Sequence, residues 1–178
     1  MRIVSGKHKG KRIIAPKKLP VRPTTDMAKE ALFNILNNQY YFEDLSILDL
    51  FSGTGNISYE FASRGAHNIT SVDGNIGCVR FIAKTAKELE YQISVIKSDV
   101  FQFLKKHLEQ YDVIFADPPY DFNLEKFTSI ADLIFEQQLL TDDGVLIIEH
   151  SEQTDLSGHQ RFTESRKYGG NLFSFFEN

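Results

Sequence analysis

The nine residues LDLFSGTGN, at positions 48–56, decide the fold of this chain. Their apolar start is typical of a buried strand, and Gly53 and Gly55 follow directly, ahead of a helix that begins near Ile57. Glycines at the end of a strand let the backbone approach a ligand closely and point free N–H groups at it. The stretch therefore predicts an α/β protein whose first strand ends in a cofactor-binding loop.

Acidic residues around this loop favour a nucleoside cofactor. The dinucleotide-binding fingerprint needs a third glycine where this chain has Ser58, so hydride transfer is disfavoured. Asp73 ends the next predicted strand, where a carboxylate can accept both hydroxyls of a ribose; the alternative is a helix N-cap. Asp49 lies within the first strand, and burial there requires a partner such as a cationic amine or a loop N–H.

Residues Asp99 and Val100 follow the third predicted strand. Asp99 can accept from an adenine amino group while the neighbouring backbone N–H donates to the ring. A cap for the helix predicted over 101–108 is an equally good interpretation, and the two are compatible.

Short apolar runs alternate with segments of helical period along the chain. Strands are predicted at 47–51, 69–73, 93–97, 113–116 and 145–149. Helical faces are predicted from Ala28, Ala31, Leu32, Ile35 and Leu36, from Ile76, Val79, Ala83 and Ala86, from Phe101, Leu104 and Leu108, and from Phe127, Ile130, Ala131 and Ile134. Two further strands, 162–168 and 172–176, flank a glycine-rich connection and form an antiparallel hairpin. The pattern predicts a mostly parallel seven-stranded sheet with helices on both faces, similar to Rossmann-like class I methyltransferases.

The tetrapeptide DPPY, at positions 117–120, follows the apolar run 113–116. Two prolines fix the backbone, so the Asp117 side chain and the Pro118 carbonyl form a rigid pair of acceptors. An exocyclic amine on a nucleobase has two N–H donors to match them, and Tyr120, like Phe122, can stack on the base. A base held in this way must be unpaired or flipped out of its helix. Together with the glycine loop, this motif predicts methyl transfer from S-adenosylmethionine to an amino group on nucleic acid.

The start of the chain is strongly basic. Eight cations and no acid precede Asp26, whereas the other residues carry 12 cations and 24 acids. Segments 2–6 and 10–14 flank a lysine-rich connection and predict a hairpin anchored by Ile3, Val4, Ile13 and Ile14. We expect a basic arm, 1–24, that grips a polyanion, and a catalytic domain, 25–178.

Composition sets further limits. The single cysteine, Cys78, excludes an internal disulfide and fits a reducing compartment, and the sequence has no signal peptide or apolar stretch long enough to cross a bilayer. We expect a cytoplasmic monomer. The five histidines are scattered and none stands at a ligand spacing from another, so no metal site is predicted.

These motifs, with MRIVSGK at 1–7, RPTTD at 22–26 and EALFN at 30–34, resemble the RsmD family. That family methylates the guanine exocyclic amine of one nucleotide in small-subunit ribosomal RNA. The resemblance implies a partner that is ribosomal RNA or the assembling small subunit. It implies a cofactor site from Asp49, Phe51, Gly53, Gly55, Asp73, Asp99 and Val100. It also implies a catalytic element from Asp117, Pro118 and Tyr120, and an arm that contacts RNA or closes over the cofactor. The cations expected at the RNA are Arg2, Lys7, Lys9, Lys11, Arg12 and Arg22.

The chain departs from the family pattern at three positions. Ser5 and Met27 stand where glycine and arginine are more frequent, and Asp73 stands where glutamate is common. Two other functions remain open on the motifs alone. One is methylation of an adenine or cytosine amine in DNA or RNA, and the other is RNA binding without catalysis.

Overall fold

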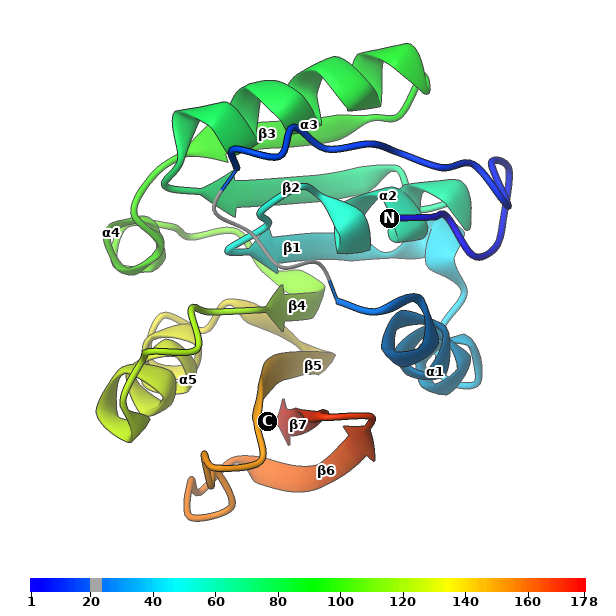
Figure 1. Cartoon of the computed structure of the whole chain (residues 1–178). Coiled ribbons are helices and arrows are strands. Elements are labelled where there is room, and N and C mark those ends of the chain that lie inside the picture. The colour runs from blue at the N-terminus through cyan, green and yellow to red at the C-terminus, as the bar shows by residue number, and fades with distance from the viewer. Residues whose placement is uncertain (20–23) are drawn as a thin grey trace.

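The protein, described here over residues 1–19 and 24–178 of a computed structural model, is built on one seven-stranded sheet (Figure 1). The strand order is β3-β2-β1-β4-β5-β7-β6. Strands β1 to β5 are parallel, and β7 runs antiparallel between β5 and β6. The strands are β1 (Ser46–Leu50), β2 (Asn68–Asp73), β3 (Ile93–Lys97), β4 (Tyr111–Ala116), β5 (Leu140–Ser151), β6 (Phe162–Tyr168) and β7 (Asn171–Glu177). The predicted sheet and its closing hairpin are confirmed.

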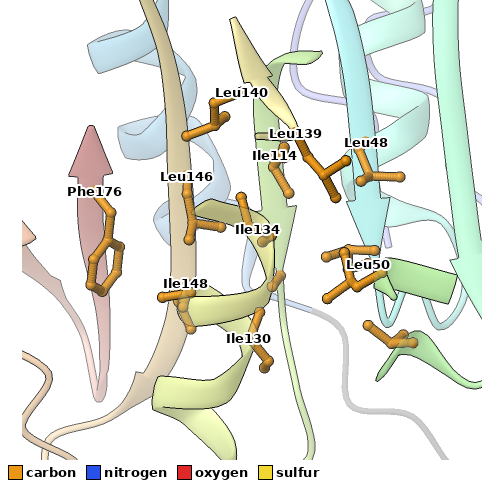
Figure 2. Close-up of a cluster of buried hydrophobic side chains, with 14 of the residues drawn as sticks. Leu48, Leu50, Ile114, Ile130, Ile134, Leu139, Leu140, Leu146, Ile148 and Phe176 are labelled. Atoms are coloured by element: carbon orange, nitrogen blue, oxygen red, sulfur yellow. The ribbon is translucent and has the colours of Figure 1, made fainter. Parts of the chain in front are cut away.

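Helices cover both faces of the sheet, because its central strands are apolar on both sides. They are α1 (Asp26–Asn37), α2 (Asn56–Ser63), α3 (Ile76–Glu88), α4 (Val100–Leu104) and α5 (Leu124–Glu136), with a 3-10 turn η1 (Phe42–Asp44) before β1. Leu48 and Leu50 pack with α4 and α5 on one face, as Figure 2 shows for part of this cluster. Ile47 packs with α1 and α2 on the other face. The alternation along β1 thus sends Asp49 to the face of α1 and α2.

Two predicted helical faces were wrong in detail. In α3 the buried residues are Cys78, Ile82, Thr85 and Ala86, while Ala83 is exposed, because the helix turns a polar threonine and the cysteine toward α2. The helix after Asp99 ends at Leu104 rather than near Leu108, whose exposed fraction is 82%. The helix ends here because the chain must turn back to begin β4 at Tyr111. Leu104 is the last buried residue of α4.

The N-terminal arm pairs with itself more weakly than a full hairpin. Its two halves are antiparallel but share one isolated bridge, Arg2 with Arg12, supported by a hydrogen bond from Ile3 N to Lys11 O of 2.9 Å. Ile3 and Ile13 are buried as anchors against α2 and α3. The expectation for Ile14 was wrong: its exposed fraction is 89%, because inward-facing Ile13 turns it toward solvent.

The arm is held to the body mainly by α2. Glu60 of that helix accepts from Val4 N at 2.8 Å and from Ser5 N at 3.0 Å, and Ser63 O accepts from Lys7 N at 2.7 Å. In Figure 1 the dark blue arm runs beside α2 and along α3. Segment 20–23, which includes the expected RNA contact Arg22 and the start of the RPTTD motif, lies outside the described residues. Among the residues described, no helix has the length and apolar character required to span a bilayer.

Candidate active site

A cavity of about 550 Å³ opens at the carboxyl ends of β1 to β4. Every predicted cofactor residue except Gly55 lines it, and so do the three predicted catalytic residues. The cavity lies where the strand order reverses between β1 and β4, the usual position of ligand sites in open α/β sheets. The fold therefore brings the glycine loop and the DPPY motif to one place.

The glycine loop needs an unusual backbone. Phe51, Gly53 and Gly55 have φ values of 55°, 54° and 79°, and a non-glycine residue in this region stores strain that is typical of functional loops. At Gly55 a Cβ would lie 2.8 Å from the Tyr59 ring and 3.0 Å from Ile82, so no larger residue fits. Gly55 thus shapes the loop from behind and caps the start of α2.

Asp73 ties the first two strands together at the cavity. Its Oδ2 accepts from Gly53 N at 2.8 Å and its Oδ1 accepts from Asn75 N at 2.7 Å. The N-cap of α3 is Asn75, so the capping alternative for Asp73 was wrong. Asp73 is half-exposed at the cavity wall, which suits an acceptor for ribose hydroxyls.

Asp99 caps a helix, as one of its two interpretations predicted, and also lines the cavity. Its side chain accepts from Gln102 N at 2.9 Å and caps α4, and the residue lines the cavity beside Val100. A carboxylate at this edge of the cavity is suited to recognition of a purine amino group.

Asp49 is buried, with an exposed fraction of 2%. Its partners are the Ser58 hydroxyl, which also lies 2.6 Å from the Ser71 hydroxyl, and the Ser58 backbone, so a backbone N–H is a partner as the sequence suggested. Burial raises the pKa of Asp49 to about 7, against the lowering effect of the Ser58 hydrogen bonds. The serine in place of a third glycine was the sequence signal for this pairing.

The DPPY motif continues β4 into the cavity. Asp117 N donates to Leu50 O at 3.4 Å, and Phe122 N donates to Pro119 O at 3.0 Å to close the turn. Burial, the charge of Glu149 and the charge of Asp49, in that order, raise the pKa of Asp117 well above its usual value. A carboxyl with this raised pKa at a cavity wall is suited to accept a proton or to offset a nearby positive charge.

Two aromatic residues of this region lie in different environments. Tyr120 has an exposed fraction of 44% and lies at the cavity mouth, where a base can stack on it. Phe122 instead packs against Phe51, with ring centroids 5.8 Å apart, and against Phe101 at 6.1 Å. Phe122 thus stiffens the cavity wall, and the predicted stacking role fits Tyr120 better.

Sequence reasoning missed a buried polar group behind the cavity. Lys29 of α1 is fully buried, and its Nζ lies 3.2 Å from Glu60 Oε2, 2.8 Å from Asn56 Oδ1 and 2.7 Å from Arg2 O. Asn56 lines the cavity and donates to Thr24 O at 3.0 Å. A lysine among apolar residues of a helix gave no signal that it would point inward.

One end of the arm lines the cavity, and the other end contacts a residue of the cavity wall. Thr54 Oγ1 donates to Met1 Sδ at 3.7 Å, and Thr24, the first described residue after the gap, lines the cavity. Of the predicted RNA contacts in the described part of the arm, all five are exposed: Arg2, Lys7, Lys9, Lys11 and Arg12. Arg2 pairs with Asp26 at 3.1 Å and Lys7 with Glu90 at 3.8 Å.

Solved structures of other proteins share this architecture. A hypothetical protein of Thermus thermophilus superposes with a TM-score of 0.86 at 26% identity, over 100% of this chain and 99% of that one. A T. thermophilus 16S ribosomal RNA N2 methyltransferase, RsmC, in complex with AdoMet and guanosine, superposes with a TM-score of 0.73 at 19% identity, over 89% of this chain and 45% of that one. The sheet has the Rossmann-like fold of class I methyltransferases, as expected.

Sequence comparison narrows the class to a family. Residues 1–177 match the family described as Conserved hypothetical protein 95. Ribosomal RNA small subunit methyltransferase D of Buchnera aphidicola is 35% identical over 150 residues, which covers 84% of this chain and 75% of the relative. The chain therefore belongs to the Conserved hypothetical protein 95 family, and its resemblance to RsmD-type methyltransferases is confirmed.

Proposed function

We propose that this protein transfers a methyl group from S-adenosylmethionine to the exocyclic N2 amine of a guanine in small-subunit ribosomal RNA. The observation that carries the proposal is the cavity that joins the glycine loop and Asp73 to Asp117, Pro118 and Tyr120. The RNA substrate is supported by the family relative from Buchnera, and guanine by the likeness to RsmC with guanosine. Adenine and cytosine amines are outcomes of the test.

The residues of the cavity fit this cofactor. Gly53 lets the backbone come close to a ligand, while Asp73 and Asp99 offer acceptors to a ribose and a purine amine. When bound, the cofactor supplies an electrophilic methyl group on a cationic sulfur. The buried acids Asp49 and Asp117 make this end of the sheet favourable for a positive charge.

The DPPY motif performs the proposed work on the amine. The Asp117 carboxylate and the Pro118 carbonyl accept from the two N–H groups, which turns the nitrogen lone pair toward the methyl group. Asp117 then offsets the positive charge that develops on nitrogen as the N–C bond forms, and it takes the released proton. Alignment of the two reactants supplies most of the rate, on the order of 7 to 11 kcal/mol for well-oriented groups.

The arm is the proposed RNA contact and the remaining residues, 25–178, the catalytic domain. The exposed cations lie on a segment that ends at Thr24 in the cavity lining and begins at Met1 beside Thr54, so a polyanion bound along the arm is led toward Asp117. An acidic body disfavours binding elsewhere.

Substitution of Asp117 tests the proposal. The Asp117→Ala variant removes the acceptor but leaves the glycine loop intact, so calorimetry should show unchanged affinity for S-adenosylmethionine. Transfer of labelled methyl groups to small-subunit RNA should fall by about 10²-fold or more, the usual cost of losing an electrostatic group of this kind. Near-normal turnover would remove Asp117 from the mechanism. The Asp121→Ala variant, at an exposed neighbouring carboxylate, serves as the matched control and should keep normal turnover.

A further inference from the structure

Glu149 is a second buried carboxylate beside the catalytic motif. Ala116 of β4 pairs with Ile148 of β5, so Asp117 and Glu149 follow at the same level on adjacent parallel strands. Adjacent strands are about 4.8 Å apart, and both side chains turn to the face covered by α1 and α2. Glu149 has an exposed fraction of 1% and is not among the residues that line the cavity.

This carboxylate is buried next to another acid. Its charge raises the pKa of Asp117, which means that the two acids repel each other in the fold. A buried acid next to another acid costs stability, and such arrangements are concentrated at functional sites. Its position therefore calls for a functional reason.

The contacts of Glu149 supply that reason. Its Oε2 accepts from Thr24 Oγ1 at 2.6 Å, and its Oε1 accepts from Asn171 Nδ2 at 2.5 Å. Asn171 begins β7 at the tip of the closing hairpin, and its Oδ1 accepts from the Tyr120 hydroxyl at 3.4 Å. One carboxylate thus joins the end of the arm, the hairpin and, through Asn171, the aromatic ring of the catalytic motif.

We propose that Glu149 is a positioning residue for the methyl transfer: it fixes Asn171, and through Asn171 the ring of Tyr120, beside Asp117. The inference rests on the function proposed above. Its chemistry is specific, because a carboxylate accepts from both Thr24 and Asn171 and leaves the Asn171 oxygen turned toward the Tyr120 hydroxyl. Since Tyr120 is the stacking surface for the base, loss of this support should affect the reaction step more than cofactor binding.

Exchange of the hydrogen-bond donor and acceptor between Glu149 and Asn171 tests this geometry. In the Glu149→Gln variant a single acceptor oxygen remains for the two donors, Thr24 and Asn171, so the hold on Asn171 is weakened and kcat should fall about tenfold or more. The Asn171→Asp variant places two carboxylates in contact and should lose a similar factor. In the double variant, Glu149→Gln with Asn171→Asp, donor and acceptor are exchanged and kcat should recover most of the loss. Affinity for S-adenosylmethionine should stay within about twofold throughout.

Ser174→Ala provides the matched control on the same two strands. The Ser174 hydroxyl lies 2.7 Å from His150 Nε2, away from Asp117, so its loss tests general damage to β5 and β7 and should leave kcat unchanged. Normal kcat in both single variants, or no recovery in the double variant, would overturn the role of Glu149.

A second measurement needs no methyl transfer and so separates this inference from the proposed function. The signal of the Tyr120 ring in ¹³C-tyrosine NMR can be assigned with the Tyr120→Phe variant. It should shift in Asn171→Ala, a truncation at the partly exposed first residue of β7, and in Glu149→Gln, and return in the double variant. An unchanged Tyr120 signal in Asn171→Ala would overturn the proposed link whether or not the parent protein methylates RNA.

Discussion

At the scale of single residues, the site is governed by carboxylates that the fold holds away from water. Asp49 and Asp117 both have raised pKa values, and in each case burial is the largest cause. A protein that evolved only for stability would place apolar residues here. A cation bound nearby would favour the charged form of these acids, which fits a cationic methyl donor.

The raised pKa of Asp49 predicts a pH dependence of stability. The folded protein keeps the Asp49 proton until the pH reaches about 7, whereas the unfolded chain releases it near 3.8. Between these values the folded state binds more protons, so the contribution of Asp49 to stability is full below the lower value and lost as pH rises through the upper one. The Asp49→Asn variant lacks this change, while Asp117 is present in both proteins.

Urea unfolding of both proteins across this pH window measures the effect. The free energy of unfolding of the parent, relative to Asp49→Asn, should decrease steadily as pH rises from about 4 to about 7. Parallel stability curves for the two proteins would contradict a protonated Asp49 in the fold.

At the scale of elements, the arm depends on one close approach. Gly6 has φ 81°, and a Cβ there would lie 1.8 Å from Ser63 O of α2. Gly10 has φ 84° with no atom within 4 Å of such a Cβ. The two glycines share the left-handed backbone and differ only in contact, so they form a matched pair.

Alanine substitution at these two positions separates docking from backbone strain. Gly10→Ala should cost about 1 to 2 kcal/mol in the arm, the penalty for a left-handed residue. Gly6→Ala should also break the contacts of Val4, Ser5 and Lys7 with α2 and release the arm. Trypsin, which cuts after lysine and arginine, should then cleave the arm of Gly6→Ala much faster than that of Gly10→Ala. Equal cleavage rates would show that the arm is not held at Ser63.

Elements were easier to predict from sequence than the contacts between them. The continuous apolar run 113–116 was correctly predicted as a buried parallel strand, and the hairpin of 162–168 and 172–176 was also found. The buried face of α3 and the end of α4 were missed, because Cys78, Thr85 and Leu108 take their places from tertiary packing. The local sequence pattern determines which helix or strand forms. Which of its residues are buried depends on the elements that pack against it in the fold.

In the candidate site, too, single motifs were easier to predict than contacts between distant segments. Motifs that cluster within a few residues, such as the glycine loop and DPPY, were found, and they meet in one cavity. The link from Thr24 through Glu149 and Asn171 to Tyr120 joins segments that lie far apart in sequence, and no local signal marks it. Ser58 was noted only as a missing glycine, although it is the partner of Asp49.

At the scale of the whole molecule, charge and architecture act together. Cations are concentrated in the first 25 residues, while the remainder has twice as many acids as cations. Thr24, at the end of this basic arm, lines the cavity that holds Asp117, and Met1, at its start, contacts Thr54 of the cavity wall. This charge distribution is the basis of the proposal that a polyanion approaches along the arm toward the methyl acceptor site.

The identity of the methylated base is the most direct test of this account. The protein is offered labelled S-adenosylmethionine with small-subunit ribosomal RNA, the assembled small subunit and DNA in parallel, and the products are digested to nucleosides. We predict that the label appears as N2-methylguanosine from small-subunit RNA, either free or assembled, and not from DNA. Label in an adenine or cytosine nucleoside, or no transfer to any of the three substrates, would contradict the account.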